Sequence, residues 1–124
     1  ASKTKLTYVY DKEKDSVSKL TMEIVYDITK DEQYTETVRS QRDEAVAEME
    51  GIEGVTYTKK DDSNYIGLTI EVDVNKFKFD DAASRKKAPI LYNTVNAALK
   101  RKDNMVSYQL SKDAILEYEF KEVK

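Results

Sequence analysis

The side chains with which this chain could do chemistry are mostly carboxylates. Its 124 residues include 24 Asp and Glu but no Cys and no His, which excludes thiol or imidazole catalysis and Cys or His zinc sites. A pair of carboxylates could act as general acid and base if a cleft held them about 5–9.5 Å apart. Glu71 and Asp73 share one face of a predicted strand beside Thr69, with no apolar pocket evident to raise a pKa. We interpret this pair as a solvated face and predict no catalytic residue.

Two acidic loops could bind a cation, but both fit turns better. The first begins with the alternating acids of a calcium loop, Asp11, Glu13 and Asp15. It then has Ser16 where the tight turn needs Gly and Met22 where a bidentate Glu should stand. The second loop, residues 61–64, has the Asp, Ser and Asn side chains that bond the backbone of a hairpin turn. We therefore predict no metal and no cofactor.

Motifs of other enzyme classes are missing as well. The sequence contains no Gly-rich phosphate loop, no serine elbow and no dinucleotide fingerprint. Ser84 and Lys87 are spaced as neighbours on one helix face, which does not by itself give the enclosed pocket that Ser-Lys catalysis needs. An enzyme that used only carboxylates, Tyr or Lys remains a less favoured alternative.

The nine tyrosines are the main candidates for a ligand surface, in a chain without Trp. A Tyr on a strand covers the sheet with its ring while its hydroxyl reaches water or a partner. Tyr8, Tyr10 and Tyr26 share the parity of predicted core residues. Tyr57 and Tyr65 are the two candidates for ligand binding, and their alternative role is packing at the core or its rim.

A basic segment is the second candidate binding surface. The net charge of -3 gives no general attraction to nucleic acid, so no nucleic-acid partner is predicted. Residues 84–102 nevertheless contain six basic residues and no acid: Arg85, Lys86, Lys87, Lys100, Arg101 and Lys102. These cations could simply close two helices, where the helix dipole favours them. Alternatively, they could face teichoic acid or anionic lipid headgroups.

The elements that must position these residues follow from hydrophobic periodicity. Alternation from Lys5 to Tyr10 and from Leu20 to Ile28 predicts a hairpin. A helical spacing then predicts a helix over about residues 31–50, which Thr29 or Asp31 would cap and Gly51 would end; its apolar stripe is Tyr34, Val38, Ala45, Met49 and Ile52.

A second strand pair follows the helix. The segment from Val55 to Lys60 precedes a polar turn, after which five apolar residues alternate strictly: Ile66, Leu68, Ile70, Val72 and Val74. Because Phe77 and Phe79 have the other parity, a bulge or strand end is expected near Asn75. The order ββαββ predicts an α+β fold, an antiparallel sheet of about four strands with helices on one face.

The last third of the chain is predicted to be mainly helical. We expect a short helix over 80–87 and a second that begins at Pro89, buries Leu91, Val95, Ala98 and Leu99, and ends over 100–104. Residues 105–110 are expected to be extended. Ser111 would cap a closing helix through Ala114, Ile115 and Tyr118, although Leu116, Tyr118 and Phe120 also alternate as a strand would.

The length indicates one domain, because the folded-area scaling buries about two thirds of a chain of this size in one core. No apolar run approaches the roughly 18 residues of a membrane-spanning helix. The chain opens with Ala1-Ser2-Lys3 and not with Met, from which we expect that an upstream segment was removed. Residues 1–4 are then the remnant of a tether, and residues 5–124 are the α+β domain.

Several stretches resemble the YehR-like family of small bacterial lipoproteins, over roughly residues 5–81 and again at the C-terminus. They are Leu6-Thr7-Tyr8-Val9-Tyr10, Gly51-Ile52-Glu53-Gly54-Val55, Thr69-Ile70-Glu71-Val72-Asp73 followed by Phe77-Lys78-Phe79-Asp80, and Phe120-Lys121-Glu122-Val123. The chain departs from the family pattern in two places: the lipid-modified Cys is absent, and residues 85–110 match poorly.

This resemblance implies export and a lipid anchor on the outer side of the bacterial cell membrane. We expect a non-catalytic domain that binds a ligand, a cell-wall polymer or an envelope protein. It would touch the membrane only through an N-terminal lipid that this chain lacks. The alternative is association through strand edges, as a homodimer or with a partner, so a monomer and a homodimer both remain open.

Overall fold

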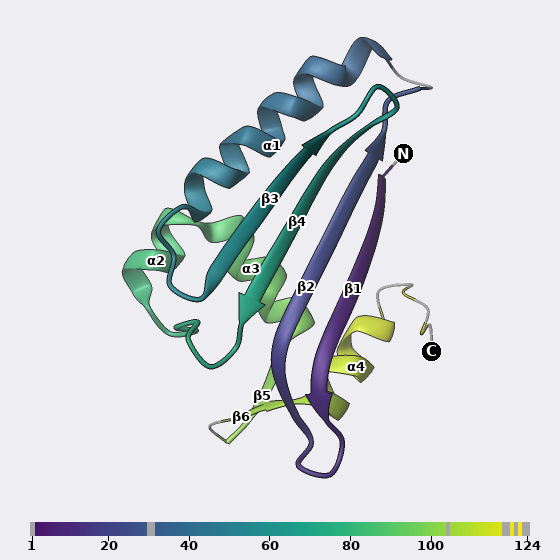
Figure 1. Cartoon of the computed structure of the whole chain (residues 1–124). Helices are drawn as coiled ribbons and strands as arrows, with labels where there is room; N and C mark the ends of the chain where they lie inside the picture. Colours follow the sequence, from purple (N-terminus) through teal and green to yellow (C-terminus); the bar gives the residue numbers. More distant parts are fainter. Residues whose placement is uncertain (1, 30–31, 104, 118–119, 121, 123–124) are drawn as a thin grey trace.

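The computed structural model describes the whole chain apart from residues 1, 30–31, 104, 118–119, 121 and 123–124. β1 (Ser2–Asp11) and β2 (Ser16–Asp27) form the predicted first hairpin, and β3 (Val55–Asp61) pairs with β4 (Tyr65–Asp73). β2 pairs with β1 along one edge and with β4 along the other. Four long antiparallel strands therefore lie in the order β3-β4-β2-β1 (Figure 1).

Two short strands extend this sheet to six. β5 (Lys100–Lys102) pairs with β6 (Met105–Ser107), and β6 joins β2 where Ser107 meets Ser16. The expectation that residues 100–104 end a helix is therefore wrong for 100–102, and residue 104 lies outside the described residues. The reason is a tertiary contact, since Leu99 is buried and the Lys100 amide donates to the Ser111 hydroxyl over 2.8 Å.

Four α-helices and one 3-10 turn complete the α+β fold. They are η1 (Glu32–Tyr34), α1 (Thr35–Met49), α2 (Ala82–Lys87), α3 (Pro89–Ala98) and α4 (Tyr108–Leu116). Pro89 stands at the first turn of α3, as predicted. Among the described residues, no helix is both long enough and apolar enough to cross a bilayer.

The ends of α1 test the predicted caps. Gly51 has a left-handed φ of +82°, as predicted, but the helix already ends at Met49. The cap residue Glu50 is extended, and Gly51 lies in the turn that the Ile52 amide and the Met49 carbonyl oxygen close. Thr29 does not cap the start, because its amide and hydroxyl both donate to Asp27. The other predicted cap, Asp31, lies outside the described residues. Tyr34 stands in the 3-10 turn before α1 and is exposed, so its placement in the apolar stripe was wrong.

The core lies on one face of the sheet, against α1 and α3. The even residues of β4 from Ile66 to Val72 are buried and the odd ones are not, apart from Gly67, so the predicted alternation is confirmed. β4 ends at Asp73, and the turn that follows returns Phe77 and Phe79 to the core. The expected change of phase near Asn75 is therefore a strand end.

The C-terminal region differs from prediction in its capping. The expected extended segment stops at Ser107, whose hydroxyl accepts from the Leu110 amide over 3.1 Å and caps α4. Ser111, the predicted cap, is fully buried inside the helix. The helix runs through Ala114 and Ile115, as predicted. Three further residues of the predictions, Tyr118, Lys121 and Val123, lie outside the described residues.

The first hairpin is tied to α4 by Asp15. Its carboxylate accepts from the Ser107 hydroxyl over 2.6 Å and from the Gln109 amide over 2.7 Å. These bonds favour the charged form, so the pKa of Asp15 is lowered. The loop of the first hairpin and the start of α4 are more than ninety residues apart in the sequence, yet these hydrogen bonds join them.

Candidate functional site

The helices leave part of the core face of the sheet uncovered, because α1 lies along the β3 side and α3 and α4 lie behind the lower part (Figure 1). β2 has 12 residues, which is about 40 Å of strand, whereas α1 has 15 residues, which is about 22 Å of helix. In the part of the chain that the structure describes, no helix lies behind the upper ends of β1 and β2.

One face of β2 therefore has a closed half and an open half. In the closed half, Leu20 and Met22 are 0% and 1% exposed. In the open half, the next two residues of the same face, Ile24 and Tyr26, are only half-buried. We use the terms closed half and open half for these two regions of the core face below.

The open half is hollowed into a groove of about 490 Å³. Its floor is the sheet, with Ile24 and Tyr26 of β2 and Ile66 and Leu68 of β4; Val38 and Ala45 of α1 form one wall, with Ile90 of α3 at the end. Ile90 is 65% exposed. The groove therefore presents a mostly apolar surface with the volume of a small-molecule site.

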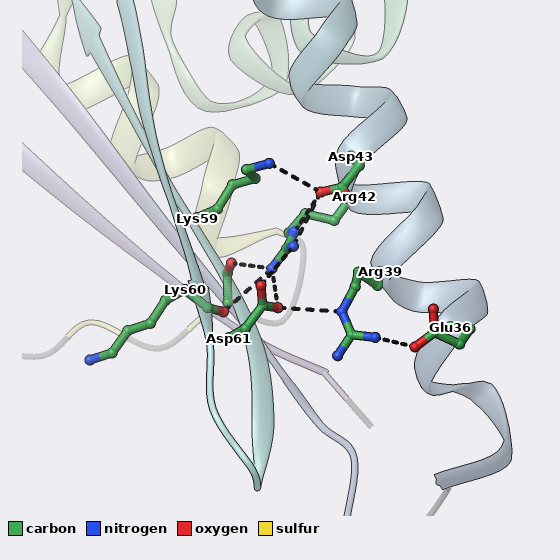
Figure 2. A network of polar contacts seen from close by, with 8 residues as sticks. Glu36, Arg39, Arg42, Asp43, Lys59, Lys60 and Asp61 are labelled. Atoms are coloured by element: carbon green, nitrogen blue, oxygen red, sulfur yellow. Dashed lines mark hydrogen bonds and ion pairs between the residues drawn. The ribbon is translucent and has the colours of Figure 1, made fainter.

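A buried arginine stands beside the groove, between α1 and β3 (Figure 2). The Arg42 side chain is 6% exposed and donates two hydrogen bonds, of 2.7 and 3.2 Å, to the Asp61 carboxylate. Arg42 also donates to Asp43 over 3.1 Å and lies 3.4 Å from the carbonyl oxygens of Lys60 and Gly67. Burial of this charge is tolerated because it is paired and hydrogen-bonded.

The Arg42 guanidinium has no donor left for a ligand. A guanidinium has five N–H groups, and Nε, Nη1 and Nη2 of Arg42 are all engaged with Asp43, Asp61 and the carbonyl oxygens. The Asp61 bond raises the pKa of Arg42, and the Arg42 bond lowers the pKa of Asp61. Arg42 thus supports the joint between α1 and β3 and does not offer a free positive charge to the groove.

The rim of the groove carries acidic side chains instead. Glu44 and Glu48 lie one turn apart on α1 and both line the groove, together with Gln41. Neither carboxylate makes an ion pair or hydrogen bond with any residue in the described ranges. The unneutralised charge at the groove is therefore negative.

The structure does not bring the two predicted tyrosines together. Tyr57 pairs with Ile70 and so points to the core face, where its hydroxyl donates to Glu50 over 3.1 Å and its pKa is raised by that bond. Tyr65 lies on the opposite face of β4, with Lys60 Nζ 5.9 Å from its ring centre. Neither lines the groove.

The six basic candidates lie on two separate elements, and some of them already bond other residues of the chain. Arg85, Lys86 and Lys87 form the last turn of α2, whereas Lys100, Arg101 and Lys102 form β5 and so do not close a helix as expected. Lys87 donates to the Glu50 carbonyl oxygen.

Asp80, in the loop before α2, forms an ion pair with one of these basic residues and lies near a second. Arg101 grips it with bonds of 2.9 and 3.0 Å. The pKa of Asp80 is lowered by Arg101 and by nearby Arg85. The side chains of Lys86 and Lys100 make no bond with the described residues, so the anionic-polymer surface stays a prediction that rests on few free charges.

The other chemical candidates have ordinary partners. Glu71 forms an exposed ion pair with Lys19 over 3.4 Å, and Asp62 accepts from the Asn64 amide in the predicted turn. Ser84 lines a polar hollow of about 170 Å³, whose charged walls Lys78 and Glu53 pair over 3.3 Å. Within the described ranges, no group of acids is placed to hold a metal ion.

Sequence reasoning missed the groove and Arg42. A signal for Arg42 was present: the apolar stripe runs through positions 34, 38, 45 and 49, and Arg42 stands at the helical position between Val38 and Ala45. A charged residue at such a position indicates a buried ion pair. The groove had a weaker signal, namely that β2 continues to alternate for longer than one helix of this length can cover.

No protein-family model matches the sequence, and no curated protein matches it either. Among solved structures, the NMR structure of the E. coli YehR protein is similar, with a TM-score of 0.69 and 20% sequence identity. The match covers 99% of this chain and 83% of that one. The chain therefore has a YehR-like α+β fold.

Proposed function

We propose that this chain is the non-catalytic binding domain of an extracytoplasmic bacterial lipoprotein, and that its ligand occupies the groove. The lipid anchor and the location rest on the sequence motifs that resemble YehR-like lipoproteins, and the YehR-like fold is consistent with them. Binding rests on one observation: an apolar groove of about 490 Å³ on the core face of the sheet, between α1 and β2.

The groove is suited to a small, largely apolar ligand. Its floor residues belong to the face that is buried in the closed half, so burial of Ile24 and Tyr26 by a ligand would continue the core. Removal of apolar surface from water contributes about 25 cal/mol per Å². The walls are elements of regular structure, so the site is largely formed before the ligand arrives.

The pKa values of carboxyl groups favour a binding role over a catalytic one. A general acid at neutral pH needs a raised pKa, which burial or a second carboxylate provides. Asp15, Asp61 and Asp80 instead have lowered pKa values, caused by hydrogen bonds or arginines. None of the three lines the groove.

The binding proposal is tested by titration with decanol, a neutral amphiphile, followed by amide chemical shifts. We expect shifts at groove residues of β2, β4 and α1. Ala45→Phe, which fills the groove, should abolish them. Ile90→Ser should weaken binding without loss of stability, because Ile90 is 65% exposed.

The matched control is Val9→Ser, which removes an exposed apolar residue that does not line the groove. Decanol binding should be unchanged in this variant. If decanol shifts the same residues in Ala45→Phe as in the unmodified chain, or none in either, the groove is not a ligand site.

Anchoring and location require the protein made from its own gene in a bacterium. Metabolic labelling with an alkyne fatty acid should label it, and protease added to intact spheroplasts should degrade it. Absence of label, or protection from protease until the cells are lysed, would overturn the extracytoplasmic assignment.

A second candidate function is association through the edge of β1. This strand has ten residues, and among the described residues it pairs only with β2, so no strand of the described chain occupies its other edge. Open edges of this length can accept a strand from another chain. Light scattering over a wide concentration range decides this, since a monomer at every concentration contradicts self-association through this edge.

A further inference from the structure

We propose that the groove selects an amphipathic amine, a small molecule with an apolar body and a cationic ammonium head. This inference rests on the proposed function and adds the chemical class of the ligand. The apolar body would lie on the half-buried Ile24 and Tyr26, and the ammonium would lie between Glu44 and Glu48 on the rim.

The sign of the charge follows from which groups at the groove are free. Arg42 is the one basic residue in the groove lining, and its donors are already engaged with Asp61, Asp43 and carbonyl oxygens. An anionic head would therefore meet no available donor from Arg42. It would instead approach two carboxylates that have no partner in the described part of the chain.

The spacing of the acids favours an ammonium head in particular. Glu44 and Glu48 are four residues apart on α1 and so lie on the same side of the helix. Two like charges at this spacing repel each other by a few tenths of a kcal/mol, and a cation between them removes that repulsion. An ammonium group has three donors and can bond both carboxylates at once.

The occupant is small because the groove is small. Its volume of about 490 Å³ falls within the range of single-ligand sites, about 300–1,000 Å³. A second copy of this chain would need an interface of about 800 Å² per partner, and this hollow supplies only part of that area.

The test compares decylamine, decanol and decanoate, which have equal tails and a positive, neutral or negative head at pH 7. Affinities are measured from chemical-shift titrations below the aggregation limit of each amphiphile. Each exposed ion pair contributes up to about 1 kcal/mol. We therefore expect decylamine to bind about five- to tenfold more tightly than decanol, and decanoate to bind most weakly.

The double variant Glu44→Gln/Glu48→Gln isolates the charge effect. It should lose the preference for decylamine while decanol, which has no charged head, still binds. Its thermal melt should not fall, because the substitutions remove the repulsion between the two carboxylates. Glu13→Gln/Glu117→Gln changes the net charge equally at residues that do not line the groove, and it should keep the preference. If both double variants lose the preference for decylamine, that preference depends only on net charge and the inference is overturned.

The outcomes separate this inference from the proposed function. Equal affinities for all three amphiphiles overturn the amine preference and leave the groove as a binding site. A preference for decanoate overturns the assigned sign. Failure of all three to shift groove residues overturns both proposals, and so does a stable dimer in which the groove residues form the contact between two copies.

Discussion

The closed and open halves of the core face are built from the same strands, yet only one of them is a finished core. In the closed half, Leu20 of β2 and Val72 of β4 pair directly and are both 0% exposed beneath α3. In the open half, Ile24 and Tyr26 of β2 remain half-buried, although their partners on β4, Leu68 and Ile66, are 8% and 3% exposed. The two halves differ in the helices that cover them and not in their strands.

The two halves also differ in how they use polar groups. In the closed half, a neutral hydrogen bond of 2.8 Å joins the hydroxyl of the buried Tyr92 to the Lys78 carbonyl oxygen. The open half needs a buried Arg42 with two carboxylates to join α1 to β3. A charged joint in place of apolar packing keeps α1 fixed beside a groove that stays open.

The largest predicted contrast is between two substitutions on one face of β2. Leu20→Ala leaves a cavity in the closed half and should lower the free energy of unfolding by about 3 kcal/mol. Ile24→Ala removes a half-buried side chain from the open half and should cost about 1 kcal/mol. Urea denaturation measures both, and equal losses would mean that the open half is covered in solution.

Arg42→Ala should have the next largest effect. It removes the donor that lies 2.7 Å from Asp61 and 3.4 Å from the buried Gly67 carbonyl oxygen, at a cost of about 2–3 kcal/mol. Arg39→Ala is the matched control one turn earlier on α1; its partners are Glu36 and, at 3.7 Å, Asp61. This more exposed pair should contribute less than about 1 kcal/mol. If the two variants unfold at the same urea concentration, Arg42 is not a structural joint.

Tyr8→Phe tests the closed half with a smaller change. The Tyr8 hydroxyl donates to the Ala98 carbonyl oxygen at the end of α3 over 2.8 Å, a bond that contributes about 1 kcal/mol. Burial raises the pKa of Tyr8 to about 12.

The unfolded chain therefore ionises this phenol first, so stability is retained below pH 10 and falls as the pH rises towards 12. The loss of stability should be smaller in Tyr8→Phe. If both proteins lose the same stability as the pH rises from 10 towards 12, Tyr8 is open to solvent.

The smallest predicted effect is the acid dependence due to Asp15. Its folded-state pKa is lowered from 3.8 by the Ser107 hydroxyl and the Gln109 amide. The stability that it contributes is therefore present above pH 3.8 and is lost as the pH falls through the lower folded-state value. Asp15→Asn should be less stable than the unmodified chain at pH 7, and this gap should narrow by pH 3.

Urea midpoints at the two pH values measure the gap. Glu13→Gln is the control, because Glu13 lies in the same loop and makes no bond with the described residues. A gap for Asp15→Asn that is constant with pH would mean that Asp15 acts through the loop conformation and not through its charge.

Prediction from sequence was best where local pattern and burial agree. The alternation of β4 and the left-handed Gly51 are local features, and both are as predicted. The capping of α4 was missed because Ser107 and Ser111 are equally plausible caps in sequence. The choice between them depends on the distant Lys100 amide, which occupies Ser111.

The candidate site was less predictable than the fold. The predicted residues Tyr57 and Tyr65 were chosen for their chemistry, but they lie on opposite faces of the sheet. The groove arises because α1 lies on the β3 side of the sheet and α3 lies behind its lower part, and neither placement follows from a local motif. The role of Arg42 depends on Asp61, which lies nineteen residues later in the chain.

The bonds between Asp15 and the start of α4 have a consequence for the order of folding during synthesis. Asp15 leaves the ribosome long before Gln109, yet its two bonds to the start of α4 can form only when both segments are present. A nascent chain therefore holds its first hairpin without the element that locks it, and the domain can close only near the end of translation.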